Sequence, residues 1–278
     1  MKWLTFRYAG RDRVGFIKHD QVVPFEDYSS LQTVIENYSV VELVQTAGNI
    51  TSDGIDLEQI EILSPLPHPV RNIFCLGMNY RDHLAELGAS APLKPIYFTK
   101  TGPTTADKAI VTIPGMTKQL DYEAELAIVI GQSGKHLTRG NALDHVFGYT
   151  VANDLSARDI QFERGQWFFG KSFDGCCPLG PVIKLNTTDQ EPDWLIQTTV
   201  NGQVRQQSRT SQLLFGIRDI LIDLSQDLTL LPGDIILTGT PGGVGMGLKP
   251  PQYLKSGDVV VCSIEQIGQL ETRIISQT

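Results

Sequence analysis

One stretch decides the fold: Asp121-Tyr122-Glu123-Ala124-Glu125-Leu126-Ala127-Ile128-Val129-Ile130-Gly131. The apolar run from Leu126 to Ile130 stops at a glycine, which predicts a buried strand. Side chains two residues apart in a strand point to the same face, so we expect Glu123 and Glu125 to project side by side. Two carboxylates this close repel each other unless a cation or a shared proton compensates for the charge.

A third carboxylate comes from a second segment, Tyr149-Thr150-Val151-Ala152-Asn153-Asp154, which is another apolar strand that ends in an acid. Three convergent carboxylates without cysteine or histidine favour a hard cation, Mg²⁺ or Mn²⁺, over zinc. Glu123, Glu125 and Asp154 are therefore the predicted metal ligands. The plainer alternative is that the two glutamates are solvated acids at the end of a strand, which is the commoner case for an isolated Glu-x-Glu pattern.

Further motifs follow these acids and precede them. They are Gly77-Met78-Asn79-Tyr80-Arg81-Asp82-His83-Leu84-Ala85-Glu86, Leu155-Ser156-Ala157-Arg158-Asp159-Ile160-Gln161, Gly170-Lys171-Ser172-Phe173-Asp174, Cys177-Pro178-Leu179-Gly180-Pro181 and Leu237-Thr238-Gly239-Thr240-Pro241-Gly242-Gly243-Val244-Gly245. Together they resemble the fumarylacetoacetate hydrolase family over roughly residues 70 to 275. The resemblance implies a metal-dependent enzyme acting on small 2-oxo or β-diketo acids, and a mixed β-sandwich roll. Periodicity alone gives a strand-rich α+β fold.

Composition narrows the class of protein. The chain has 278 residues, of which 41% are hydrophobic and 19% charged, which is typical of a globular protein. Its formal charge of −8 and the absence of basic runs argue against nucleic-acid binding. No apolar stretch is long enough to span a membrane, and the N-terminus lacks the pattern of a signal peptide. The four cysteines form no Cys-x-x-Cys pair, which favours a reducing compartment, so we expect a cytoplasmic protein.

Prolines divide the chain. Three of them fall within Ser64–Pro69 and predict a stiff linker between a small β-rich domain at residues 1–66 and a catalytic domain at residues 70–278. In the first domain we expect a β meander and one helix from Ser30 through Leu43. In the second we expect helices at about residues 80–87, 156–163 and 211–225, and a hairpin at Asn201-Gly202.

His83 and Glu86 are the predicted catalytic dyad. Three residues apart on a helix, they share one face, and the carboxylate can fix the imidazole tautomer while the other ring nitrogen moves a proton. Such a pair is usually a surface contact, but the resemblance places it where hydrolytic members of the family carry their dyad. Lys171, expected in a loop after an aromatic run, is the predicted oxyanion stabiliser.

Arg158, Gln161 and Thr240 are the predicted substrate-binding residues. Arg158 and Gln161 are three apart on a predicted helix and can bind a carboxylate together. The glycine-rich stretch around Thr240 lacks the lysine of a phosphate-binding loop and is followed by no helix pattern. Its backbone N–H groups and the Thr240 hydroxyl can instead receive a carboxylate, and the alternative is a turn whose glycines are purely conformational.

The favoured function is divalent-metal-dependent hydrolysis of a C–C bond in an acylpyruvate-type or fumarylpyruvate-type acid. A decarboxylase or an enol–keto tautomerase would use the same metal site, and Met78 favours this alternative, since some hydrolytic relatives have arginine there. A non-catalytic binding protein that keeps the fold is the third alternative. Family members are usually homodimers, and the strand-rich composition suggests sheet edges that need covering, so we expect a homodimer.

Overall fold

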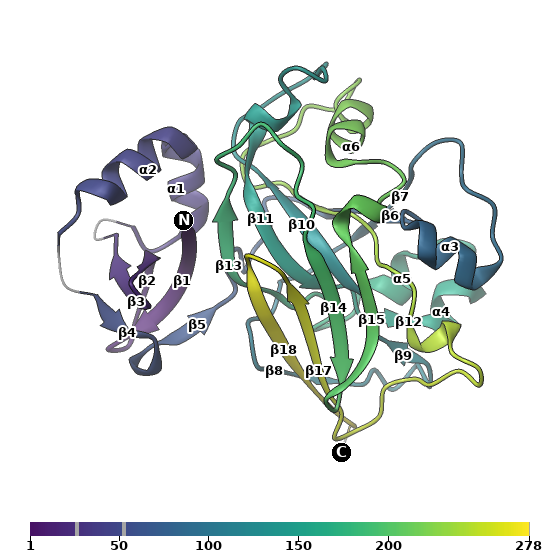
Figure 1. Cartoon of the computed structure of the whole chain (residues 1–278). Coiled ribbons are helices and arrows are strands. Elements are labelled where there is room, and N and C mark those ends of the chain that lie inside the picture. Colours follow the sequence, from purple (N-terminus) through teal and green to yellow (C-terminus); the bar gives the residue numbers. More distant parts are fainter. Residues whose placement is uncertain (26–27, 52–53, 278) are drawn as a thin grey trace.

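The computed structural model describes residues 1–25, 28–51 and 54–277. Strands dominate and the helices are short, so the predicted strand-rich α+β class is confirmed (Figure 1). None of the helices in this described part of the chain is long and apolar enough to cross a membrane. The α-helices are α1 (Leu31–Asn37), α2 (Val40–Asn49), α3 (Arg81–Leu87), α4 (Arg158–Glu163), α5 (Phe168–Lys171) and α6 (Ile217–Leu224). The strands are β1 (Lys2–Tyr8), β2 (Arg11–Lys18), β3 (Gln21–Pro24), β4 (Ile55–Asp56), β5 (Glu61–Leu63), β6 (Ile73–Gly77), β7 (Ile96–Lys100), β8 (Ala109–Thr112), β9 (Leu120–Asp121), β10 (Ala124–Ile130), β11 (Val146–Asn153), β12 (Ser156–Ala157), β13 (Leu179–Leu185), β14 (Leu195–Val200), β15 (Gln203–Arg209), β16 (Ile235–Leu237), β17 (Val259–Ile264) and β18 (Gly268–Ile275).

Two large sheets carry the fold. The first has 11 strands in the order β4-β3-β2-β1-β13-β11-β10-β16-β6-β7, with β5 also paired to β1. The second has five strands in the order β15-β14-β17-β18-β8, and β9 pairs with β12 in a small third sheet. Strands β10 and β11 are antiparallel, with Ala124 opposite Asn153. This register brings the residue after β11, Asp154, beside Glu123, whose carbonyl accepts from the Asp154 N–H at 2.8 Å.

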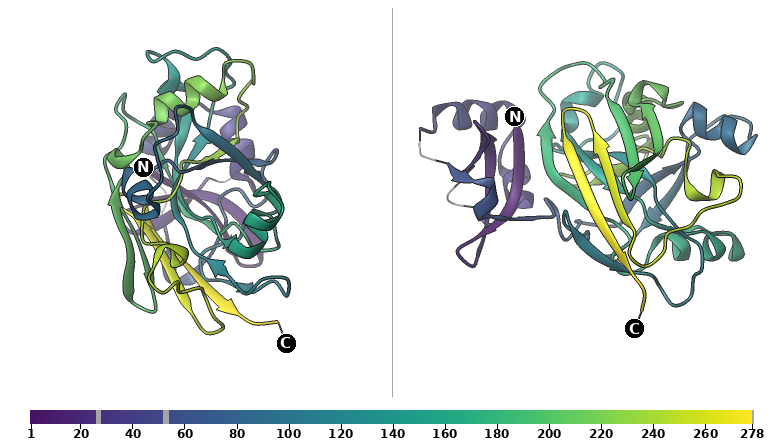
Figure 2. Two further views of the ribbon diagram at one scale, coloured as in Figure 1. Left: turned by 90° about the vertical axis from the view of Figure 1, so that its right-hand side faces the viewer. Right: turned by 60° about the horizontal axis from the view of Figure 1, so that its bottom comes forward.

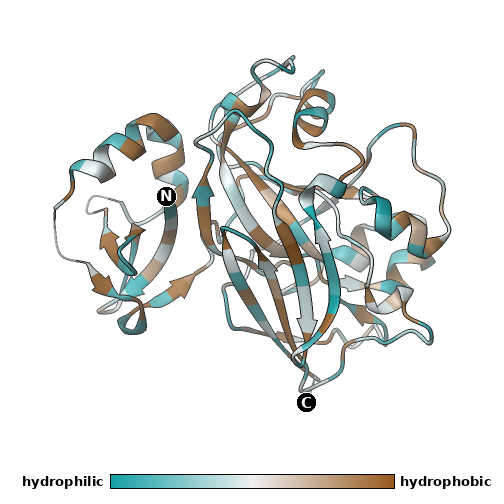
Figure 3. Cartoon of the chain, viewed as in Figure 1, coloured by the Kyte–Doolittle hydropathy of each residue, from teal (hydrophilic) through white to brown (hydrophobic). Residues whose placement is uncertain are grey.

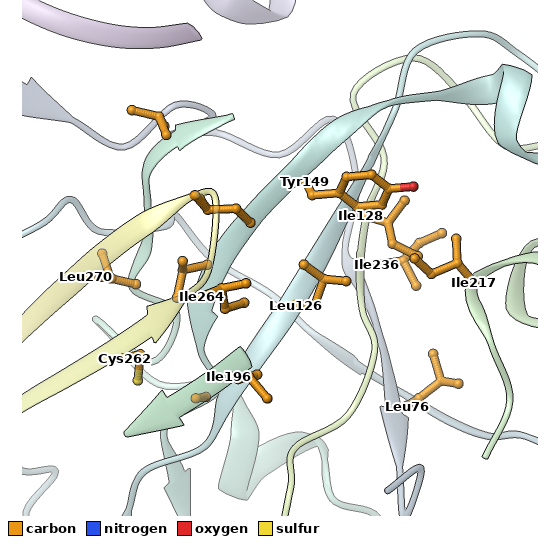
Figure 4. Packing of buried hydrophobic residues seen from close by; sticks show 14 of the residues in the cluster. Leu76, Leu126, Ile128, Tyr149, Ile196, Ile217, Ile236, Cys262, Ile264 and Leu270 are labelled. Carbon is orange, nitrogen blue, oxygen red and sulfur yellow. The ribbon is translucent and has the colours of Figure 1, made fainter. Parts of the chain in front are cut away.

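Strand β10 is buried on both faces, which explains why its sequence is apolar without alternation. Leu126 and Ile128 lie in one hydrophobic cluster, together with side chains of β14, β17 and β18 such as Ile196 (Figure 4). Ala127 and Val129, on the opposite face, belong to a second cluster. The two glutamates therefore lie at the end of a strand that the core fixes on both sides.

The described residues among the first 66 form a β meander covered by two helices, and this part lies beside the main body in Figure 1 and in the right-hand view of Figure 2. Buried side chains of α1 and α2 belong to the second hydrophobic cluster. The outer side of α1 is polar, whereas α2 also exposes Val41 and Val44 (Figure 3). The single predicted helix from Ser30 to Leu43 is wrong, because the helix breaks at Tyr38. Ser39 starts a new helix there with a capping box that includes Glu42. Strand β1 also pairs with β13 at its start, so one sheet crosses the proposed boundary, and the division into two domains stays a prediction.

The helix predicted at about residues 80–87 and the hairpin at Asn201-Gly202 are present. The helix predicted at 156–163 begins two residues late, after β12, and the helix predicted at 211–225 begins six residues late. Helix α3 ends at Gly88, which has a left-handed φ of 64°, as expected of a C-cap glycine. The hairpin turn at Asn201-Gly202 has positive φ at both residues, which matches a type I′ turn. Helix α6 begins only at Ile217, because the carboxylate of Glu191 accepts from the N–H of Ile217 at 2.8 Å and so fixes the start of the helix.

Candidate active site

The three predicted metal acids converge. Carboxylate oxygens of Glu123, Glu125 and Asp154 lie within 4.8 Å of one another, and all three residues are buried. Backbone contacts fix the positions: the Glu123 N–H donates to Asn153 Oδ1 at 3.1 Å, and Asp154 lies directly after β11. The register between β10 and β11 is therefore what assembles the cluster.

Glu125 is the member of the cluster whose charge is least compensated. Its Oε2 accepts from the Gly239 N–H at 2.6 Å, but no lysine, arginine or histidine among the described residues lies within ion-pair distance of it. Burial, followed by repulsion from Asp154 and Glu123, raises the pKa of Glu125 well above its usual range. A divalent cation would remove this penalty, and three carboxylates are the hard oxygen ligands that Mg²⁺ and Mn²⁺ take. The residues therefore fit such an ion.

Two buried lysines surround the acids. Lys171 Nζ lies 2.6 Å from Glu123 Oε2 and 2.9 Å from Asp154 Oδ2. Lys100 Nζ donates to the other oxygen of Asp154 and, at 3.1 Å, to the carbonyl of Leu155. Lys171 was expected in a loop, but it ends the short helix α5, and its ammonium lies 5.0 Å from the ring centre of Phe98. The predicted aromatic neighbourhood is present, although Phe98 comes from β7 rather than from the adjacent aromatic run.

Arg158 and Gln161 lie together on α4, as predicted. Arg158 Nη1 donates to Gln161 Oε1 at 3.0 Å and lies 2.7 Å from Glu123 Oε1. Burial alone would raise the pKa of Glu123, but the charges of Lys171 and Arg158 outweigh that effect and lower it to about 2. Glu123 and Glu125 are neighbours on one strand end whose environments therefore push their pKa values in opposite directions.

The dyad residues are in contact on α3. His83 Nδ1 lies 3.2 Å from Glu86 Oε2, and the other Glu86 oxygen accepts from the Gly243 N–H at 3.0 Å. His83 is 6% exposed, which is unusual for a surface pair and removes the surface-contact alternative. With one ring nitrogen engaged by Glu86, the other remains for proton transfer.

The glycine-rich stretch after β16 lies against both halves of the site. Gly239 donates to Glu125, and Gly243 donates to Glu86. Thr240 is buried beside them, but its hydroxyl donates to the Ala124 carbonyl at 2.9 Å and accepts from Gln206. A substrate carboxylate at Thr240 would therefore have to take the hydroxyl from Ala124 or use the backbone.

One cavity of about 290 Å³ joins these groups. Its polar lining includes His83, Glu123, Glu125, Arg158 and Lys171. The remainder is largely apolar and aromatic, with side chains from α3, β7, α4 and the glycine-rich stretch. These apolar lining residues are Leu76, Met78, Leu87, Phe98, Phe162, Trp167 and Met246. The charged side chains thus lie next to a largely apolar part of the lining. Electrostatic interactions are stronger in such an environment than in water.

Sequence analysis missed two buried charged residues next to the site. Lys100 ends the strand β7, and Asp121 ends the short strand β9. A lysine or aspartate that closes an otherwise apolar strand is a weak signal, because most such residues are solvated. Only the arrangement of β7 and β9 around β10 brings them to the acids.

Comparison with known proteins agrees with the geometry. Residues 72–275 match the family described as fumarylacetoacetate (FAA) hydrolase C-terminal. The chain is 45% identical over 223 residues to the oxaloacetate tautomerase YisK of Bacillus subtilis (strain 168), covering 78% of this chain and 74% of that protein. The structure is similar to the fumarylacetoacetate hydrolase of Exiguobacterium antarcticum, with a TM-score of 0.86, 39% identity and full coverage of both chains.

A more distant structural relative is a hydrolase. The maleylpyruvate hydrolase of Sphingobium sp. SYK-6, solved in complex with manganese(II) and pyruvate, has a TM-score of 0.80 and 25% identity, and all of both chains is covered. The similar proteins thus include both a tautomerase and hydrolases.

Proposed function

Because the chain belongs to the fumarylacetoacetate hydrolase family, we propose that it is a divalent-metal-dependent tautomerase that interconverts the enol and keto forms of a small 2-oxo acid such as oxaloacetate. This choice differs from the C–C hydrolysis that the sequence motifs favour. The identity to a protein named as an oxaloacetate tautomerase supports it, and Met78 in the cavity wall agrees with it.

The observation that carries the proposal is the shared cavity. Glu123 and Glu125 of the acid cluster and His83 of the dyad line the same space, and most of the other lining side chains are apolar. Tautomerisation requires one proton to be moved between carbon and a base, and a largely apolar lining suits that step. Hydrolysis additionally requires an attacking water held by polar groups, and the apolar wall offers few of them.

The residues take the following roles in this proposal. Mg²⁺ or Mn²⁺ held by Glu123, Glu125 and Asp154 would supply a Lewis acid that favours the enolate of the 2-oxo acid. Arg158 and Gln161 bind the substrate carboxylate. His83, oriented by Glu86, removes or returns the proton at the carbon next to the keto group. Lys171 provides positive charge beside the enolate oxygen.

C–C hydrolysis is the second candidate. It is favoured by the contact between His83 and Glu86, a pair suited to activating water, and by the similarity to maleylpyruvate hydrolase. Decarboxylation passes through the same enolate, and the acid cluster would serve it equally. The three reactions therefore differ in what happens at the carbon, not in the metal ligands.

One set of assays separates them. Purified protein with Mg²⁺ or Mn²⁺ is given oxaloacetate enriched in the enol form, and loss of enol absorbance is followed above the rate in buffer. Pyruvate release from oxaloacetate and from acylpyruvates is measured in parallel. For the wild type we expect accelerated loss of the enol form without release of pyruvate. For Glu125→Gln we expect no acceleration of enol loss. Pyruvate formed from an acylpyruvate at a higher kcat/KM than that of enol loss would make the protein a hydrolase instead.

A further inference from the structure

Asp121 is inaccessible to solvent and does not line the cavity. It does contact helix α4 and the glycine-rich stretch, both of which line the cavity. Its side chain is fully buried at 0% exposure. Its carboxylate accepts from the backbone N–H groups of Gly245 at 2.7 Å and Met246 at 3.0 Å, and from Arg158 Nε at 2.9 Å. One carboxylate thus joins the start of α4 to the glycine-rich stretch, which lies more than 80 residues away in the sequence.

On the Arg158 side, the contact fixes the plane of the guanidinium. Nε donates to Asp121, and Nη1 is shared by Gln161 and Glu123. The third nitrogen, Nη2, is buried and has no hydrogen-bond partner among the described residues. A buried donor without a partner is rare in a folded protein. Arg158 lines the cavity, and Nη2 is the one guanidinium nitrogen that these partners leave without an acceptor.

On the side of the glycine-rich stretch, the contact fixes the backbone of a segment that lines the cavity. Met246, whose side chain lines the cavity, is held by its N–H to Asp121 Oδ2. A Cβ on Gly245 would lie 2.7 Å from Asp121 Oδ1, so this segment can approach the carboxylate only as glycine. Two residues before Gly245, the N–H of Gly243 in the same loop donates to Glu86 Oε1.

We propose that Asp121 is a positioning residue for substrate binding: by holding Arg158 Nε and the Met246 loop, it presents the free Nη2 of Arg158 to the carboxylate of a 2-oxo acid. The inference rests on the proposed function in taking a 2-oxo acid as the ligand. A purely structural buried ion pair would instead stabilise the fold and leave ligand affinity unchanged in any variant that still folds.

The test is Asp121→Asn. The amide has the same shape but only one acceptor oxygen, whereas the carboxylate uses two: Oδ1 accepts from Gly245, and Oδ2 accepts from Met246 and Arg158. In either orientation the NH₂ group faces a donor, and the negative charge beside Arg158 is lost. Oxalate, a stable mimic of a 2-oxo acid enolate, is titrated calorimetrically into Mn²⁺-loaded protein, and Mn²⁺ is titrated into metal-free protein. We expect the oxalate Kd and the substrate KM to rise at least about tenfold, because a charged hydrogen-bond partner of the carboxylate-binding arginine is lost. The Mn²⁺ Kd should stay within about threefold.

Asp159→Asn is the matched control. Asp159 is the next residue on α4, and its carboxylate accepts from Thr117 and the Lys118 N–H, without contact to Arg158. This variant should bind oxalate like the wild type. Wild-type oxalate affinity in folded Asp121→Asn would overturn the inference. Absence of oxalate binding and of turnover in the wild type would instead overturn the proposed function.

Arg158→Lys covers the case in which Asp121→Asn yields no folded protein. Lysine keeps the positive charge near Asp121 and Glu123 but removes the fork that carries Nη2. We expect weaker oxalate binding with little change in the Mn²⁺ Kd. An unchanged oxalate Kd in Arg158→Lys would show that Nη2 does not receive the carboxylate, and the role of Asp121 would fall with it.

Discussion

The buried ammonium of Lys100 donates to one carboxylate oxygen of Asp154 and leaves the other oxygen to Lys171. Lys100 is 0% exposed, and it does not line the cavity that holds the acids. Burial alone would lower the pKa of Lys100, but the charge of Asp154 outweighs it, and the pKa is raised. Lys100 therefore remains charged and holds Asp154 in place, while Lys171 lies where a substrate can reach it.

Lys100→Met should destabilise the protein. The substitution leaves Asp154 buried with one of its two cations removed, and breaking a buried pair typically costs about 3–5 kcal/mol. Denaturant unfolding with EDTA present measures this. Lys135→Met is the control, because Lys135 makes only an exposed contact with Asp227 at 3.8 Å and should change the unfolding free energy little. Equal losses in the two variants would contradict the role given to Lys100.

Glu125→Gln and Glu123→Gln should change metal-free stability in opposite directions. Neutralising Glu125 removes a buried charge that has no cation partner, so the free energy of unfolding should rise. Neutralising Glu123 leaves the buried charges of Lys171 and Arg158 without this partner, so the free energy of unfolding should fall by about 3 kcal/mol or more. Both variants should bind Mn²⁺ at least about tenfold more weakly. A similar loss of stability in both variants would show that the charge of Glu125 does not destabilise the metal-free protein.

The pKa shift of Glu125 also sets a pH dependence. Because its pKa is raised in the folded protein, folding favours the protonated form, and that stabilisation is lost as pH rises above the ordinary value of 4.5. Without metal, Tm should therefore fall as pH rises from about 5, whereas the increase in Tm on adding Mg²⁺ should grow. Glu123 acts in the opposite sense, since its contribution is lost only as pH falls from 4.5 towards about 2. A Mg²⁺ effect that shrinks with rising pH would contradict this assignment.

Much of the central architecture could be predicted from the sequence, because it depends on local patterns. The apolar run from Leu126 to Ile130 identifies β10, and the acids at i and i+2 follow from its geometry. The predicted start of α6 was wrong because a distant partner decides it. Leu213 and Leu214 continue the apolar stripe of α6, but they lie extended against Asn79 and Tyr80, where Leu214 donates to the Asn79 carbonyl.

The contacts in the candidate site also fall into local ones, which the sequence predicts, and long-range ones, which it does not. His83 with Glu86 and Arg158 with Gln161 are short-range pairs on single helices, so spacing and family motifs could place them together. Lys100 reaches Asp154 across 54 positions, and no local pattern encodes that contact. The bonding of the Thr240 hydroxyl to the Ala124 carbonyl was equally out of reach, since it depends on how the glycine-rich stretch packs against β10.

His83→Ala should lower turnover by about 10²–10⁴, the usual range for loss of a general acid–base. Mn²⁺ affinity and oxalate binding should remain, because His83 is neither a proposed metal ligand nor a proposed carboxylate ligand. His136→Ala is a suitable control, as that histidine is outside the cavity lining. Wild-type turnover in His83→Ala on every accepted substrate would remove the dyad from the mechanism.

We propose that the protein is a homodimer. Strand β8 is the last strand of the five-stranded sheet, and among the described residues no further strand pairs with its outer edge. Ile110 in β8 is 64% exposed, and Ile275 in the adjacent β18 is 42% exposed. An open apolar edge is a site for association, so a second copy is expected to cover it. Light scattering should give twice the chain mass of 30.7 kDa, and Ile110→Lys should shift it towards the monomer. A monomer mass for the wild type at micromolar concentration would refute the assembly.

Gly247→Ala should impair catalysis without unfolding the protein. A Cβ on Gly247 would lie 2.6 Å from Glu86 Oε2, too close for any real contact. Because the Glu86 side chain can rotate away, the clash should break its contacts with His83 and Gly243 rather than the fold. We expect kcat to fall at least about tenfold, with Tm little changed and Mn²⁺ affinity retained. Gly48→Ala is the matched control: this glycine lies in helix α2 with nothing within 4 Å of an added Cβ, so alanine should leave kcat unchanged and raise stability by up to about 1 kcal/mol. Full activity in Gly247→Ala would mean that the contact between the glycine-rich loop and Glu86 does not orient the dyad.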